Sequence, residues 1–371
     1  MTSDRHREIL PLTGLRTGAA WWVVAFHFGR DHVGVPVLHQ ILAAGHVAVD
    51  LFFVLSGFVL AYRYRPEDVA TSRGRSAFWL RRFARVYPLY VASLMLGFYS
   101  EWPGSLHALA SEAGAVRLAA QLALLNAFSH KWMFRLNWAA WSLSVEAFFY
   151  VLFPWILPWV IRRNPRRLIV WCALAALVAP ALYAALDPDH LGRPLALGDE
   201  VLWSWYLKFF PLQRLPMFIA GAAAAQLAGM VKVPRYATAL ATVALLAIVW
   251  TRQLPYAFLQ AGALLIVFVV LVVALAAECD GDPVARVLGS APFVMLGRAS
   301  YATYILHVPL FLAWARFDAG LWTHGSHVLG YMLVLLLLSL VAHRCVEEPA
   351  RRQVVRWNAT VNQKRTRACA A

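Results

Sequence analysis

The stretch LTGLRTGAAWWVVAFHF at residues 12–28 is long and apolar enough to form most of a membrane-spanning helix. It nevertheless contains Arg16 near its start and His27 near its end. Eleven helical steps of about 100° return to within roughly 20° of the starting direction, so the two side chains share one face, about 16 Å apart. A cation and a titratable ring are unfavourable inside an apolar span, which favours a functional role. Alternatively, Arg16 extends to the membrane surface and His27 only bonds a neighbouring helix.

The composition of the whole chain is typical of a membrane protein. Of its 371 residues, 61% are hydrophobic and 14% are charged, whereas a soluble domain averages about 25% charged residues. The net charge of +15 does not predict a nucleic-acid partner, because most arginines lie in short segments between apolar runs, as in cytoplasmic loops. The four cysteines lack metal-ligand spacing, so we expect neither a metal site nor a disulfide framework.

The apolar runs predict an all-α, polytopic integral membrane protein with about ten transmembrane helices. The predicted spans are approximately residues 12–29, 40–62, 83–100, 138–161, 168–186, 207–230, 236–251, 257–277, 299–316 and 327–345. We expect the short run at 116–128 to be re-entrant or interfacial, because leaving it out places every arginine-rich segment on one side.

The same count places both termini in the cytoplasm and an acidic, proline-containing loop at 187–203 on the other side. A further loop is expected at 278–298. We predict one transmembrane domain at 1–350, a basic cytoplasmic tail at 351–371, and a multi-pass location in the plasma (inner) membrane. The first apolar stretch lacks a clear cleavage site, so we expect it to remain as the first helix.

The second predicted span contains Asp50 within AVDLFFVLSGFVL at residues 48–60. A carboxylate at this depth needs a partner, and Arg16 or His27 of the first span is the obvious candidate. Ser56 and Gly57 allow a neighbouring backbone to approach closely. The alternative role for Asp50 is only to lock helices together.

A basic segment precedes the third span, with seven arginines between residues 63 and 85. Within FWLRRFARVYP, the residues Arg81, Arg82 and Arg85 crowd one side of a helix. Guanidinium groups match the geometry of phosphate, so these arginines suit an anionic ligand. Alternatively they anchor the helix at anionic lipids.

The fourth span carries WSLSVEAFFY, in which Ser142, Glu146 and Tyr150 form a polar stripe at i, i+4 and i+8. Counted along the spans, Glu146 falls at a depth similar to that of His27. A carboxylate beside an imidazole can fix its tautomer, so we expect the two to interact.

The ninth span carries SYATYILHVP, with Ser300, Tyr304 and His307 on one helical face. His307 is either part of the site or a packing residue that is satisfied locally. Beyond the tenth span, Glu347 and Glu348 of VEEPARR can pair with loop arginines, although an exposed cluster of this kind is usually only a solvated face.

Together these motifs resemble the acyltransferase-3 family of integral-membrane O-acyltransferases, such as polysaccharide and O-antigen O-acetyltransferases. The resemblance covers about residues 12–350. It rests on LTGLRTGAAWWVVAFHF, AVDLFFVLSGFVL, FWLRRFARVYPLY, WSLSVEAFFY, SYATYILHVPL and VEEPARR in family order. One departure is Thr13, where the family commonly has aspartate before Gly-Leu-Arg. The family's optional C-terminal esterase-like domain is not expected here.

The resemblance implies an acyltransferase (EC 2.3.1.-) with a cytoplasmic acyl-CoA donor, most simply acetyl-CoA, as co-substrate and no permanently bound cofactor. Arg81, Arg82 and Arg85, with Arg16, would bind the donor. His27 would act as a general base or carry the acyl group transiently, and Glu146 or Asp50 would orient it. Ser142, Tyr150, Tyr304 and His307 would support the site.

The implied acceptor is a sugar hydroxyl of a bacterial exopolysaccharide, an O-antigen or its lipid-linked precursor. An alternative acceptor is a secreted small molecule such as a macrolide. Two alternatives come from other classes of protein: a proton-coupled transporter that uses the buried polar residues as a relay, and a scaffold subunit in which those residues only hold helices together.

Overall fold

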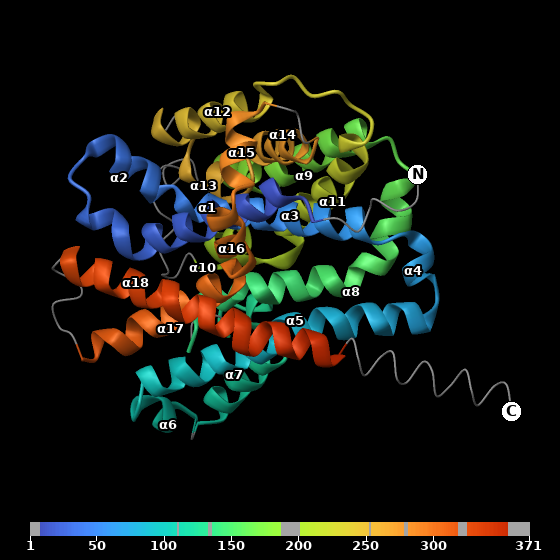
Figure 1. Cartoon of the computed structure of the whole chain (residues 1–371). Helices are drawn as coiled ribbons and strands as arrows, with labels where there is room; N and C mark the ends of the chain where they lie inside the picture. Colours follow the sequence, from blue (N-terminus) through green and yellow to red (C-terminus); the bar gives the residue numbers. More distant parts are fainter. Residues whose placement is uncertain are drawn as a thin grey trace, which may run out of the picture.

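A computed structural model of the chain describes residues 8–109, 111–132, 136–186, 201–251, 254–277, 281–317 and 325–354. Every regular element in these ranges is helical (Figure 1). The first half contains α1 (Leu10–Val24), α2 (Pro36–Ala43), α3 (Ala48–Arg63), α4 (Pro66–Ala70), α5 (Ser72–Ser100), α6 (Gly104–Leu109), α7 (Glu112–Leu122), α8 (Trp141–Ile161) and α9 (Pro165–Leu186). The second half contains α10 (Val201–Phe209), α11 (Pro211–Ala228), α12 (Ala237–Thr251), α13 (Tyr256–Gln260), α14 (Leu265–Ala276), α15 (Pro283–Leu288), α16 (Ala291–Arg298), α17 (Ser300–Ala315) and α18 (Gly325–Ala342).

Four of the described helical stretches are long and apolar enough to cross a membrane: Pro36–Arg63, Trp138–Ile161, Pro165–Leu186 and Gly325–Val354. Large apolar side chains also lie exposed on several helices, among them Trp171, Val178, Leu240 and Leu329. These are the features of a membrane protein. The count of ten spans and the side of the membrane on which each terminus lies remain predictions.

Three expectations about element boundaries are wrong. The span expected at 207–230 is two helices, because Pro211 begins α11 directly after α10, and proline suits the first turn of a helix. The span expected at 257–277 is broken between α13 and α14, where Gly262 has φ +98°. The loop expected at 278–298 contains α15 and α16.

The last predicted span is longer than expected. Its helix continues from Gly325 to Val354, so residues 351–354 of the predicted tail are helical. Residues 355–371 of that tail, and residues 187–200 of the predicted acidic loop, lie outside the described residues.

The first helix lies inside the bundle. α1 packs against α3, α14, α15, α16 and α17. In Figure 1, α15 and α16 cross the long helices at a steep angle, while α6 and α7 lie together at one edge. Because α1 is surrounded on several sides, Arg16 and His27 both line interior cavities, although not the same one.

α3 and α11 cross at very short range, as the Ser56–Gly57 pair predicted. A Cβ atom at Gly57 would lie 2.0 Å from the Phe218 carbonyl oxygen, and one at Gly221 would lie 2.0 Å from that of Val54. Each backbone therefore occupies the space that a side chain on the other helix would fill.

We predict that Gly57→Ala lowers the free energy of unfolding by about 1–3 kcal/mol, because the added methyl group forces α3 and α11 apart. Thermal unfolding in detergent micelles measures the effect. Gly18→Ala is the matched control, since a Cβ there meets nothing within 4 Å. Equal stability of the Gly57 variant and the control would contradict the close crossing.

Candidate active site

His27 lies in a widened turn at the end of α1. The regular helix stops at Val24, and residues Ala25–Gly29 form a π-helical turn, a local insertion that often occurs at functional sites. The Nδ1 atom of His27 is 3.0 Å from the Val23 carbonyl oxygen. A carbonyl only accepts hydrogen bonds, so it holds the proton on Nδ1.

A second histidine reinforces this arrangement. His307 of α17 is fully buried, and its Nδ1 atom contacts the Tyr304 carbonyl oxygen and donates to it. The Nε2 atom of His307 is then an acceptor, and it lies 3.3 Å from Nδ1 of His27. Both neighbours therefore require a proton on Nδ1 of His27, which leaves its Nε2 atom with a free lone pair. Nε2 makes no hydrogen bond with the described residues.

His27 lines a cavity of about 820 Å³, which we call the histidine cavity. Its wall also includes His46, Asp50, Trp138, Lys208, Arg214 and Tyr304. His27 thus lies beside an internal space of the kind in which small molecules commonly bind.

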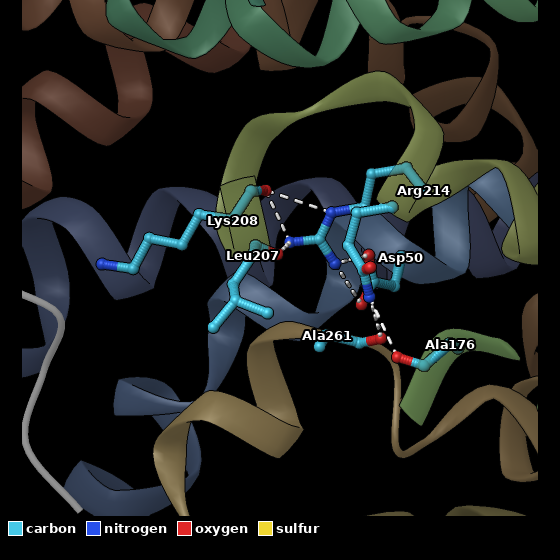
Figure 2. Close-up of polar contacts among 7 residues, drawn as sticks. Asp50, Ala176, Leu207, Lys208, Arg214 and Ala261 are labelled. Atoms are coloured by element: carbon cyan, nitrogen blue, oxygen red, sulfur yellow. Dashed lines mark hydrogen bonds and ion pairs between the residues drawn. The ribbon is translucent and has the colours of Figure 1, made fainter. Parts of the chain in front are cut away.

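Asp50 lies in this cavity wall, but its partner is neither Arg16 nor His27, which corrects the sequence-based expectation. Nη1 of Arg214 donates to the Oδ1 and Oδ2 atoms of Asp50 at 2.9 and 3.2 Å, and the two side chains are 2% and 5% exposed. Nη2 of Arg214 also donates to the Leu207 and Lys208 carbonyl oxygens (Figure 2). The ion pair thus joins α3, α10 and α11.

Glu146 lies in a different cavity from His27, which corrects the expectation that the two interact. Its Oε1 atom accepts hydrogen bonds from Ser56 at 2.9 Å and from Tyr150 at 2.5 Å. The sequence-based expectation compared only how deep Glu146 and His27 lie within their spans. Depth does not specify which side of a neighbouring helix a residue faces. The hydroxyl of Ser142 instead donates to that of Tyr304 at 2.8 Å.

Glu146 lines what we call the central cavity, of about 780 Å³, together with Arg16, Arg82, Arg85, Tyr150 and Tyr304. Three of the four arginines assigned to donor binding therefore meet in one cavity. Among the described residues, the buried Nε atoms of Arg16 and Arg82 have no hydrogen-bond partner. Arg81 instead donates to the Tyr64 hydroxyl at 3.2 Å, outside this wall.

A third and larger cavity, which we call the mouth cavity, lies where the start of α1 meets the end of the α18 helix. It measures about 1810 Å³, and its wall includes Arg16, Arg63, Arg85, Arg298, Arg344 and Arg351. Arg63, Arg298, Arg344 and Arg351 were not selected from the sequence, because only the fold brings these segments together.

Carboxylates balance part of this charge. Arg298 donates to Glu8 at 2.6 Å, and the Thr13 hydroxyl donates to Glu8 at 2.9 Å. Burial alone would raise the pKa of the Glu8 carboxyl, but the hydrogen bonds and the Arg298 charge outweigh it and lower the pKa below its ordinary value. Glu8 is therefore held near the start of α1 by Arg298 and Thr13.

Glu347 and Glu348, near the end of the last helix, also have partners. Glu347 contacts Nδ1 of His343 at 2.9 Å, and Arg352 donates to Glu348 at 2.5 Å. The sequence suggested a loop arginine as the partner, but Arg352 lies one turn later on the same helix. Among the residues that the structure describes, no cluster of three His, Cys, Asp or Glu side chains could hold a metal ion.

The three cavities follow one another through shared walls. Arg16 and Arg85 line both the mouth and the central cavity, and Val49 and Tyr304 line both the central and the histidine cavity. The three cavities therefore adjoin one another, from the arginine-rich mouth to the cavity that His27 lines.

Arg214 was also missed in the sequence. The available signal was LQRLPMF at residues 212–218, where a single arginine interrupts an apolar run and needs a partner. Its partner Asp50 is 164 residues away, so the pair could not be assigned before the fold was known.

We predict that Arg214→Met lowers the free energy of unfolding by about 3–5 kcal/mol, because Asp50 is then buried without its counter-charge. Adding Asp50→Leu removes the second charge, so the double variant should recover at least half of the loss. Urea unfolding in micelles measures both variants. A double variant as unstable as the single one would show that the pair is not the dominant interaction here.

The chain matches the Acyl_transf_3 family, an acyltransferase domain, over residues 10–344. It is 30% identical to the acyltransferase MdmB of Streptomyces mycarofaciens over 92% of this chain and 91% of that protein. It is 24% identical to the putative peptidoglycan O-acetyltransferase YrhL of Bacillus subtilis, over 95% of this chain and 56% of that protein. It is 23% identical to the O-acetyltransferase OatA of Staphylococcus aureus, over 97% of this chain and 60% of that protein.

The chain thus spans little more than half the length of YrhL and OatA. No solved structure matches it significantly. The family match covers most of the chain and agrees with the apolar helices and with the motifs around Arg16 and His27. This protein is therefore an acyltransferase and belongs to the acyltransferase-3 family.

Proposed function

We propose that the protein is a membrane-bound O-acyltransferase that moves an acetyl group from cytoplasmic acetyl-CoA to a sugar hydroxyl. The acceptor that we propose is a bacterial exopolysaccharide, an O-antigen or a lipid-linked precursor. The observation that carries the proposal is the series of adjoining cavities from the arginine-rich mouth to the cavity that His27 lines. In this proposal the chain spans the inner membrane about ten times, with both termini in the cytoplasm.

The donor would enter by the mouth cavity. Its phosphates suit guanidinium groups, and the mouth is more than twice as large as either inner cavity. The unpaired Nε atoms of Arg16 and Arg82 would complete their hydrogen bonds on the bound donor. Its acyl end would then pass through the central cavity toward Tyr304 and His27.

His27 would act as the general base. Its Nε2 atom takes the proton of the acceptor hydroxyl while the hydroxyl oxygen attacks the thioester carbonyl carbon. The carbon–sulfur bond breaks, and the departing CoA thiolate takes up the proton from the His27 imidazolium. Val23 and His307 keep the Nδ1 proton in place, so that the lone pair remains on Nε2.

Asp50 and Glu146 have different roles in this proposal. Asp50, neutralised by Arg214, holds the wall of the histidine cavity. Glu146, held by Ser56 and Tyr150, offsets the arginine charges of the central cavity so that the acyl chain can pass.

A second route uses the same nitrogen. The Nε2 atom of His27 attacks the thioester carbonyl carbon, CoA leaves, and the acetyl group rests on His27 until the acceptor hydroxyl takes it. Labelled acetyl groups that remain on the protein after a single turnover without acceptor would identify this route.

A second candidate acceptor is a secreted small molecule with a sugar hydroxyl, such as a macrolide, and the same chemistry would serve it. MdmB, whose name states no acceptor, matches this chain over nearly its whole length, whereas YrhL, named for peptidoglycan, extends well beyond the match.

We predict that His27→Ala lowers acetyl transfer by about 10²–10⁴-fold, because the base is lost. The assay follows label from acetyl-CoA to methyl glycosides, with purified protein in nanodiscs. His32→Ala, an exposed histidine five residues later, is the control. Full transfer by the His27 variant would exclude both routes, and glycoside uptake into proteoliposomes without acetyl-CoA would favour a transporter.

We also predict that Arg85→Gln raises KM for acetyl-CoA about 10–100-fold, since a charge-assisted hydrogen bond contributes about 1.5–3 kcal/mol. KM for acetyl-pantetheine, which lacks the phosphates, should not change. Arg352→Gln, outside the mouth wall, is the matched control. An equal effect on both donors would argue against phosphate binding by Arg85.

A further inference from the structure

The histidine cavity contains buried polar atoms that the proton transfer does not use. One ring nitrogen of His46 is taken up by the Ala43 backbone, and the other has no hydrogen-bond partner among the described residues; Nε1 of Trp138 has none there either. Both residues line the cavity wall beside His27. A buried polar group without a partner is unfavourable by about 1–3 kcal/mol, so each such group in a native protein needs an explanation.

These two side chains are held rigidly. His46 follows Gly45, where a Cβ atom would lie 2.3 Å from the Trp22 carbonyl oxygen, so this segment is fixed against α1. Trp138 follows Asn137, whose side-chain amide donates to Ser93 and to the Ile305 carbonyl oxygen at 3.1 and 2.8 Å. The unpaired atoms therefore cannot easily turn toward other partners, which is the condition of a preorganised binding site.

The unpaired atoms of His46 and Trp138 limit which ligand groups can form hydrogen bonds with them. The Trp138 indole can only donate a hydrogen bond, whereas a neutral imidazole such as His46 donates with one nitrogen and accepts with the other. A carboxylate or phosphate would meet the Trp138 donor but not the accepting nitrogen. Hydroxyl groups, which both donate and accept, satisfy both the remaining nitrogen of His46 and the Trp138 donor.

The surrounding rings suit the remainder of a sugar. The Trp138 ring lies 6.2 Å from the His27 ring, and the His46 ring lies 5.3 Å from Phe26 and 5.2 Å from Tyr256. Aromatic faces pack against the apolar CH face of a pyranose, whose edge carries the hydroxyls. The wall also contains two cations: Arg214 is paired with Asp50, and Nζ of Lys208 lies 5.3 Å from the centre of the Tyr256 ring.

We propose that the histidine cavity is the acceptor site and that it binds an uncharged glycosyl ring through hydrogen bonds from its hydroxyls to His46 and Trp138. The inference rests on the proposed function, because it assigns the acceptor of that reaction. A third hydroxyl of the same ring faces Nε2 of His27. The donor's acyl end and the acceptor thus reach His27 from opposite cavities, with Tyr304 in the wall between them.

Saturation-transfer NMR of the protein in nanodiscs tests this site without any acyl-CoA. The probes are methyl α-glucopyranoside, methyl α-mannopyranoside and methyl α-rhamnopyranoside. Trp138→Phe and His46→Phe keep a ring but remove the polar atoms. Each variant should bind the glycoside about three- to tenfold more weakly, and the double variant at least tenfold more weakly.

The controls make the same chemical changes away from the cavity. Trp171→Phe and His32→Phe alter exposed residues and should bind as the wild type does. Thermal unfolding checks that each variant is folded; if His46→Phe is unstable, Trp138→Phe alone decides the outcome. No binding of any of the three glycosides to the wild type, or unchanged binding by the double variant, overturns the proposal.

Failure of the site and failure of the proposed reaction give different results. Glycoside binding without acetyl transfer by the wild type would contradict the reaction while supporting the glycosyl site. Acetyl transfer by the wild type with an unchanged glycoside KM in both variants would overturn the acceptor site alone.

Discussion

The buried ion pair between Asp50 and Arg214 is the interaction on which the interior arrangement depends. A charge inside an apolar bundle is tolerated only beside its counter-charge, so α11 must lie where Arg214 reaches α3. The close crossing at Gly57 and Gly221 permits that distance, because bulkier residues would separate the helices. Arg214 also holds the last carbonyl groups of α10, and α10 contributes Lys208 to the wall of the histidine cavity.

The polar groups of the interior fall into two sets. One set is satisfied within the fold, as in Asp50–Arg214, Glu146–Tyr150 and His27–His307. The other set has buried atoms without a hydrogen-bond partner among the described residues. Some of these lie on the cavity walls, in Arg16, Arg82, Trp138, Ser300 and Glu347, and others lie away from the three cavities, in Asn126, Trp205, Gln226 and Thr238. The first set fixes the fold.

The sequence predicted the features that depend on local patterns. The helices and the meeting of Arg82 and Arg85 follow from helical periodicity alone. The shared face of Arg16 and His27 stays a prediction, because the π-helical turn at Ala25–Gly29 breaks the regular count and the two residues line different cavities. The side-chain partners could not be obtained in this way. His307 reaches His27 across 280 residues, and Arg214 reaches Asp50 across 164. Depth within a span placed Glu146 beside His27, but depth carries no information about which helices are neighbours.

The central claim is that donor and acceptor meet at Nε2 of His27 after entering by different cavities. A cryo-electron-microscopy structure with a non-hydrolysable acetyl-CoA analogue tests it most directly. The account predicts phosphate density beside Arg16 and Arg85 in the mouth cavity, and the acetyl end within reach of His27 beyond Tyr304. Phosphates bound elsewhere, or an acetyl group that ends beside Glu146 without reaching the histidine cavity, would contradict it.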